Sequence, residues 1–302
     1  KLIITYSDMK AKEIYEDYKL YDKSVYIYPA KDIIFYSADI HGNALVKDRL
    51  KILRKLIEKE PITIITTLDG GMDKILPLDF LKESVINIEE ASTVDFTKLQ
   101  GKLIHLGYER LGQVEGPGEF AVRGGILDIY PPTEDCPYRI ELWGDEVDSI
   151  RSFDVNSQRS IENVKSLKIY PAAEMILSRD RMVQGLKRIE DETKQYVAKL
   201  REQYKTEEAA RIKSIIDEFK DNIVSFQGSV GIDSYINYFY DKTVSLFDYF
   251  EGETAIVFLD EPTRIIEKGE AVETEFREGM IGRIDKGYIL PGQSDVIYSY
   301  KE

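Results

Sequence analysis

Apolar and polar positions follow two different patterns along this chain. Up to about residue 92, short apolar runs that suit buried strands are separated by stretches with apolar residues every three or four positions, which predict amphipathic helices. In chain order, these predicted strands and helices are residues 1–6, 9–21, 24–30, 43–60 and 62–67. Ser7 or Asp8 can cap the first helix, and Pro61 ends the second. Strands that alternate with helices predict a parallel sheet covered by helices.

From about residue 95 to residue 174 the helical spacing disappears and glycines become frequent. Four short runs follow one another there: "LIHLGYE", "EFAVRGGILDIYP", "YRIELWGDEVDSIRSFD" and "VKSLKIYP". They predict a small, mostly antiparallel β domain. The second run is expected to be one strand with Gly124 and Gly125 at its centre. Because glycine has no side chain, we expect another backbone to approach there, and Arg123 to stand free of neighbours on its face.

The third part of the chain begins with a long helical stretch, from residue 178 to about residue 223. Its predicted buried face consists of Leu186, Ile189, Val197, Leu200, Ile212, Ile215 and Phe219. An α/β pattern returns at "ETAIVFLDEP", which suggests that the first and third parts pack together. We therefore predict an α/β protein with segments 1–94, 95–175 and 176–302, in which the middle segment is an inserted β domain.

Composition and charge narrow the classes of function. The net charge of the 302 residues is -14, which argues against a general affinity for nucleic-acid backbones. Cys136 is the single cysteine, so no intrachain disulfide can form and a reducing, cytoplasmic location is expected. No apolar run approaches the length of a membrane span, so no membrane contact is predicted. Because the chain starts at Lys1 without a methionine, we interpret it as a fragment of a longer protein.

The candidates for catalytic chemistry are weak. Two histidines, His41 and His105, and one cysteine are too few to predict a zinc site. Asp260 and Glu261 follow an apolar strand, which is where P-loop ATPases hold Mg²⁺, but they also suit a strand that runs into a polar turn. The phosphate-binding motif G-x-x-x-x-G-K-[ST] is absent from these 302 residues. We therefore predict neither an enzyme nor a cofactor, and no metal site.

Three stretches strongly resemble the bacterial transcription-repair coupling factors (the Mfd family): "GEFAVRGGILDIYPP", "YRIELWGDEVDSIRSFDVNSQRS" and "KIYPAAE". Their N-terminal module is similar to the excision-repair protein UvrB. "LDEPTR" and "RIDKGYILPGQSD" resemble the last part of that module, so the resemblance covers nearly the whole chain. It implies a helicase-like parallel-sheet domain in two segments, 1a (1–94) and 1b (176–302), with the small β domain 2 (95–175) between them. It also implies that domain 2 docks the damage-recognition ATPase UvrA, while RNA polymerase and DNA are bound by regions outside this chain.

Two departures from UvrB separate the functional hypotheses. UvrB has a phosphate-binding loop, and it has a long DNA-clamping β-hairpin for which "FYSADIHGN" (35–43) is too short. These departures favour a non-catalytic module that recruits UvrA to stalled RNA polymerase. The alternatives are a fragment of a UvrB-type helicase with an ATP site and an unrelated α/β enzyme that binds a nucleotide or a sugar phosphate.

The family motif places the UvrA-contacting positions on Arg123, Arg139 and Trp143. The even offset from Arg139 to Trp143 puts both on one face of a strand, and Arg and Trp contribute most to binding at interfaces. We therefore expect alanine at Arg123 or Arg139 to weaken UvrA binding while the domain keeps its melting temperature. In the alternative, Trp143 belongs to the core and the arginines pair inside the domain with one of the carboxylates Glu141, Asp145 and Glu146.

Overall fold

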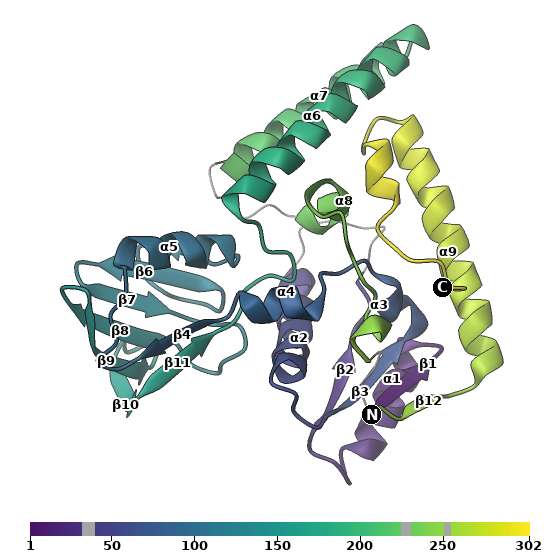
Figure 1. Cartoon of the computed structure of the whole chain (residues 1–302). Helices are drawn as coiled ribbons and strands as arrows, with labels where there is room; N and C mark the ends of the chain where they lie inside the picture. The colour runs from purple at the N-terminus through teal and green to yellow at the C-terminus, as the bar shows by residue number, and fades with distance from the viewer. Residues whose placement is uncertain (32–39, 225–230, 251–254) are drawn as a thin grey trace.

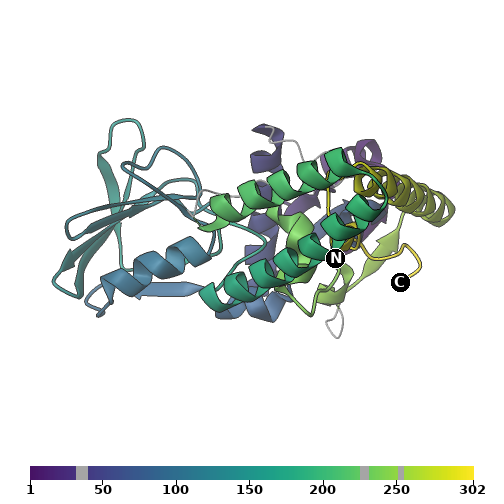
Figure 2. The same cartoon turned by 90° about the horizontal axis from the view of Figure 1, so that it is seen from above.

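The chain folds into a parallel-sheet lobe, a β-rich lobe and a projecting pair of helices (Figure 1). The computed structural model describes residues 1–31, 40–224, 231–250 and 255–302. Most of the segment 35–43, which was predicted to be too short for a DNA-clamping hairpin, lies outside the described residues. Seen from above, the pair of helices, α6 (Arg179–Glu202) and α7 (Thr206–Val224), crosses over the parallel-sheet lobe (Figure 2).

The parallel sheet has four strands in the order β12-β1-β3-β2, and all of its pairings are parallel. These strands are β1 (Leu2–Thr5), β2 (Val25–Tyr28), β3 (Thr63–Thr67) and β12 (Val257–Leu259). β1 and β3 are buried along their whole length, as expected for strands with helices on both faces. Leu2 pairs with Val257, so the first and third parts of the chain share one sheet, as predicted.

Five helices surround this sheet in the described ranges. They are α1 (Asp8–Tyr18), α2 (Ile40–Ile57), α3 (Leu68–Met72), α4 (Leu78–Glu83) and α9 (Pro262–Asp285). Of these, the apolar spacing predicts α1 and α2. The Ser7 hydroxyl accepts a hydrogen bond from the Lys10 amide at 3.2 Å, which confirms the first of the two predicted caps. α2 ends at Ile57, shortly before Pro61.

The β-rich lobe is built on a six-stranded sheet in the order β10-β9-β8-β7-β6-β5, antiparallel except for the β5–β6 pair. Its strands are β5 (Glu109–Leu111), β6 (Glu119–Arg123), β7 (Ile126–Ile129), β8 (Tyr138–Trp143), β9 (Glu146–Phe153) and β10 (Ser160–Val164). A separate antiparallel ribbon joins β4 (Ile86–Glu89) to β11 (Ser166–Ile169). Because β4 comes before residue 95, the exact start of the inserted domain stays a prediction.

One helix of this lobe contradicts the sequence interpretation. The run "LIHLGYE" was expected to be a strand, but α5 (Phe96–His105) occupies its first half. Asp95 caps this helix by accepting a hydrogen bond from the Lys98 amide at 2.9 Å. Leu99 and Leu103, one helical turn apart, are buried in the same cluster as Phe120 of the sheet. α5 therefore covers the inner face of the sheet (Figure 1). On the outer face, Val114 packs over Ala121 and Phe153, so part of that face is buried as well.

The glycine pair forms a turn and does not lie inside a single strand. Arg123 pairs with Ile126, so Gly124 and Gly125 are a two-residue hairpin loop between β6 and β7. Gly124 has a φ of +60°, which favours glycine at this position. A Cβ atom at Gly125 would lie 2.8 Å from the Leu142 carbonyl oxygen, which confirms that another backbone approaches there.

The long helical stretch is two antiparallel helices, α6 (Arg179–Glu202) and α7 (Thr206–Val224). The chain reverses at Tyr204, which has a φ of +59°. The predicted face is buried except at Leu186 and Ile215, which are half-buried, and Ile216 is buried beside Ile215. The remaining helical elements are η1 (Ile232–Tyr235), α8 (Ile236–Phe239), η2 (Phe247–Phe250) and η3 (Pro291–Ser294).

A buried ion network joins the three parts of the chain. Arg49 of α2 is completely buried and donates hydrogen bonds to Asp73 at 2.7 Å and to Glu174 at 2.6 Å. Lys31 pairs with Glu174 and with Asp233 of η1. Burial alone would raise the pKa of Glu174, but the charges and hydrogen bonds of Arg49 and Lys31 outweigh it and lower this pKa to about 2. The network ties the segment that leaves the β-rich lobe to both segments of the parallel-sheet lobe.

Candidate functional site

The outer face of the six-stranded sheet brings together charged side chains from neighbouring strands. Asp128 on β7 lies directly between Ala121 on β6 and Arg139 on β8 in the strand register. Arg123 lies two residues beyond Ala121 and therefore points to the same face. We call Arg123, Asp128, Arg139 and Trp143 the outer-face cluster.

Both predicted arginines bind the same carboxylate. Arg139 donates from Nε to Oδ1 of Asp128 at 2.7 Å and from Nη2 to Oδ2 at 2.8 Å. Arg123 donates from Nη2 to Oδ2 at 2.7 Å. Asp128 is only 1% exposed, so one buried negative charge holds two positive charges. The prediction that Arg123 stands free of neighbours is wrong, because its long side chain reaches diagonally to β7.

The two arginines differ in their exposure to solvent. The Arg139 side chain is 17% exposed and stacks over the Phe153 ring, with its guanidinium carbon 4.7 Å from the ring centroid. Its hydrogen bonds to Asp128 raise the pKa of its guanidinium above the ordinary value. The Arg123 side chain is 49% exposed. Arg123 is therefore the more accessible of the two guanidiniums.

Trp143 ends β8 and is 85% exposed. Its neighbour Leu142 packs against the main core, so Trp143 points to the opposite, outer face together with Arg139. The alternative that placed Trp143 in the core is therefore wrong. Tryptophan is enriched at binding surfaces, so the exposed indole is a candidate contact for a partner.

The alternative of internal ion pairs is right about the arginines and wrong about the carboxylates. Arg123 and Arg139 both pair with Asp128, whereas Glu141 pairs with Arg151. The sequence interpretation overlooked Asp128. The sequence did contain a signal for Asp128. It is a single carboxylate within the apolar run "ILDI", and a carboxylate in a buried strand needs a charged or hydrogen-bonding partner.

The other candidates from the sequence that the structure describes lie in separate parts of the fold. Asp260 follows β12 and accepts a hydrogen bond from the Thr5 hydroxyl at 3.0 Å. His105 is the last residue of α5, and burial lowers the pKa of its imidazole. The side chain of His41 lies outside the described residues. Among the side chains that the structure describes, no group of three or more His, Cys, Asp or Glu residues is arranged to hold a metal ion.

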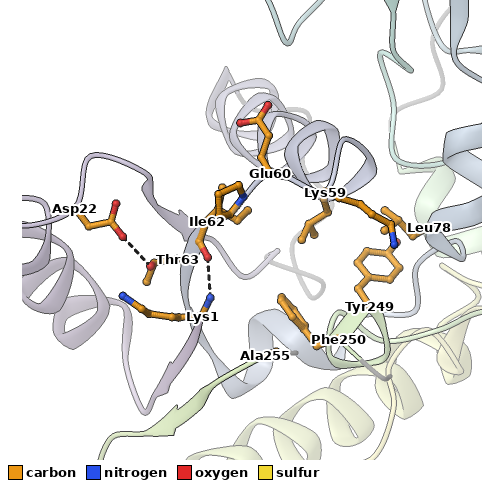
Figure 3. A pocket seen from close by; sticks show the side chains of 12 residues that line it. Lys1, Asp22, Lys59, Glu60, Ile62, Thr63, Leu78, Tyr249, Phe250 and Ala255 are labelled. Atoms are coloured by element: carbon orange, nitrogen blue, oxygen red, sulfur yellow. Dashed lines mark hydrogen bonds between the residues drawn. The ribbon is translucent and has the colours of Figure 1, made fainter. Parts of the chain in front are cut away.

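A pocket of about 450 Å³ opens at the amino ends of β1 and β3 (Figure 3). Leu78, Tyr249 and Phe250 form an apolar side, and Lys1 and Asp22 lie across from them. Asp22 accepts hydrogen bonds from the Ser24 amide and the Thr63 hydroxyl, so its carboxylate serves the local structure. Open α/β sheets bind ligands at the carboxyl ends of their strands, which is the opposite edge. The pocket therefore adds no candidate for catalysis.

No helix within the described ranges is long and apolar enough to cross a membrane.

Comparisons with known proteins agree on one family. The family model described as the UvrB interaction domain matches residues 86–175, which include the outer-face cluster. The transcription-repair-coupling factor of Bacillus subtilis (strain 168) is 32% identical over 290 residues, which cover 95% of this chain and 24% of that protein. The transcription-repair-coupling factor of Staphylococcus epidermidis (strain ATCC 12228) is 32% identical over 299 residues, or 98% of this chain and 25% of that protein. The chain thus spans about a quarter of the length of these relatives.

Proposed function

The chain belongs to the family of the UvrB-like N-terminal module of transcription-repair-coupling factors, and from this premise we propose that it is a non-catalytic recruitment module that binds UvrA. In this role it brings nucleotide excision repair to stalled RNA polymerase. RNA polymerase and DNA are bound by parts of the full-length protein outside these 302 residues. The setting is the bacterial cytoplasm.

The observation that carries the proposal is the outer-face cluster. Trp143 is exposed to water, and the half-exposed guanidinium of Arg123 lies on the same outer face of the sheet. Trp and Arg are among the side chains that contribute most binding energy in protein interfaces. The cluster also lies within the residues that match the UvrB interaction domain.

Electrostatics favour a protein partner over nucleic acid. The chain carries a net charge of -14, which opposes general binding to a nucleic-acid backbone. A local pair of guanidiniums that shares one buried carboxylate keeps one net positive charge. Such a site suits a carboxylate on a protein surface, which an arginine can bind with two parallel hydrogen bonds.

Calorimetric titration of this chain with UvrA tests the proposal. We expect saturable binding that weakens at least about tenfold in Arg123→Ala, because truncation of a hot-spot residue commonly costs about 2 kcal/mol. Arg277→Ala is the matched control, since Arg277 is exposed on α9 and pairs with Glu273 only one turn away. Absence of binding by the parent chain, or equal loss in the two variants, would contradict the proposal.

The helicase alternative has a separate test. An ATP site would give hydrolysis that DNA stimulates and that Asp260→Ala abolishes. We expect no hydrolysis above background from the purified chain, because triphosphate binding needs a nest of backbone amides and a lysine.

A further inference from the structure

We infer that Asp128 is the positioning residue of the outer-face cluster: its buried carboxylate orders Arg123 for the partner before binding occurs. This inference rests on the proposed function, because it concerns how the same face recognises UvrA.

Asp128 accepts hydrogen bonds from both arginines. Arg139 supplies a bidentate pair, with one bond to each carboxylate oxygen. A carboxylate has about four acceptor sites, so Oδ2 accepts a further bond from Arg123 without losing the bond from Arg139. This bond fixes the end of the half-exposed Arg123 side chain on a buried group.

The strand register explains how the contact is made. Arg123 is the last residue of β6 and lies opposite Ile126, so Asp128 is its diagonal neighbour on β7. Long side chains span such diagonals. Ala121 lies directly opposite Asp128, and its small side chain leaves the path from Arg123 to the carboxylate open.

The bond leaves Arg123 able to bind a partner. A guanidinium carries five N–H donors, and the contact with Asp128 uses one donor on Nη2. The side chain remains 49% exposed, so its other donors are accessible to a carboxylate of UvrA. A side chain that is already ordered loses less conformational entropy on binding than a mobile one.

Affinity measurements in two backgrounds test the inference. Asp128→Asn keeps the shape of the side chain and removes its charge, and we expect it to weaken UvrA binding roughly 2- to 13-fold, the ordering cost of one long side chain. In an Arg123→Ala background the same substitution should cause a clearly smaller loss, because the residue through which Asp128 acts is gone. An equal loss in both backgrounds would mean that Asp128 supports only the fold, and the inference would be overturned.

A second measurement uses the unchanged chain and does not depend on UvrA. Nitrogen-15 relaxation of the Arg123 Nε–H group in the free protein should give an order parameter close to that of Arg49, which is completely buried. A value typical of a freely rotating side chain overturns the inference even if UvrA binds. If Arg123 is ordered but the parent chain does not bind UvrA, the proposed function fails and the ordering by Asp128 stands.

Discussion

Arg139 and Asp128 lie directly opposite each other on β8 and β7, and two parallel hydrogen bonds of 2.7 and 2.8 Å join the guanidinium to the buried carboxylate. This pair connects the stability of the β-rich lobe to its candidate docking face. It also changes one expectation from the sequence. We expect alanine at Arg139 to lower the melting temperature, because it removes two of the three hydrogen bonds that the arginines donate to a carboxylate that is 1% exposed.

The first prediction concerns Arg139→Ala. Removal of one partner from a buried pair commonly costs about 3 kcal/mol or more, and here Arg123 remains as a single partner for Asp128. We expect the free energy of unfolding to fall by about 3 kcal/mol in a denaturant titration. Arg159→Ala is the control, because Arg159 is exposed in the same lobe and should change stability by at most about 0.5 kcal/mol. Equal stabilities of the two variants would show that the Arg139–Asp128 pair contributes nothing.

The second prediction separates binding from stability at Trp143. Because the Trp143 side chain is 85% exposed, Trp143→Ala should change the free energy of unfolding by at most about 0.5 kcal/mol relative to the parent chain. It should nevertheless bind UvrA at least about tenfold more weakly, as expected for an aromatic hot spot. Ile161→Ala is a suitable control, since Ile161 on β10 is also apolar and 63% exposed. Unchanged affinity of the Trp143 variant would remove the indole from the docking face.

The division of the chain into α/β parts and a β-rich part could be predicted from the sequence, because it depends on the spacing of apolar residues. Buried parallel strands are continuous apolar runs, and this pattern identified β1, β2 and β3 together with the shared sheet. α5 was missed because the stretch "LIHLGYE" is short and contains apolar residues at spacings that fit either a strand or a helix. Only its packing on the sheet, through Leu99 and Leu103, decides between them.

Part of the candidate site was also predictable, because the spacing of residues within one strand decides which of them share a face. The sequence places Arg139 and Trp143 on one face of a strand, and the structure agrees. The partner of the arginines depends on which strands are neighbours and in what register, and neither can be deduced from spacing within one strand. The interpretation of Gly124 and Gly125 as the middle of one strand therefore concealed the β6–β7 hairpin. Without that hairpin, the diagonal contact between Arg123 and Asp128 on neighbouring strands could not be predicted.

The third prediction tests the close approach of two backbones at Gly125. A Cβ atom there would lie 2.8 Å from the Leu142 carbonyl oxygen, and a backbone atom in a sheet cannot move aside cheaply. The Leu142 amide also donates to the Gly125 carbonyl at 2.8 Å, so a shift would strain this bond as well. We expect Gly125→Ala to lower the free energy of unfolding by about 1–3 kcal/mol.

Gly112→Ala provides the matched control for Gly125. Gly112 lies in the same lobe, and a Cβ atom there would meet no other atom within 4 Å. Its substitution should leave stability unchanged or raise it by up to about 1 kcal/mol, because alanine restricts the unfolded chain. Equal effects of the two substitutions would argue against the packing of β8 on the turn.

The last prediction concerns acid and the buried ion network. The pKa of Glu174 is lowered to about 2 from the ordinary value of 4.5, so the folded state favours the ionised carboxylate. A lowered pKa contributes stability that is complete above pH 4.5 and is lost as the pH falls towards 2. The contribution at neutral pH is on the order of 3 kcal/mol, and half or more of it should disappear by about pH 3.

The measurement is the free energy of unfolding from pH 7 to pH 2 for the parent chain and for Glu174→Gln. We expect the variant to be less stable at pH 7, because Arg49 then keeps Asp73 alone of its two charged partners in the described part of the chain. The variant should approach the parent as the pH falls. Carboxylates outside the network titrate in both proteins alike, so the difference between the two curves reports Glu174 together with Asp73, which shares Arg49 with it. A difference that stays constant from pH 7 to pH 2 would show that Glu174 is not held as an ion by Arg49 and Lys31.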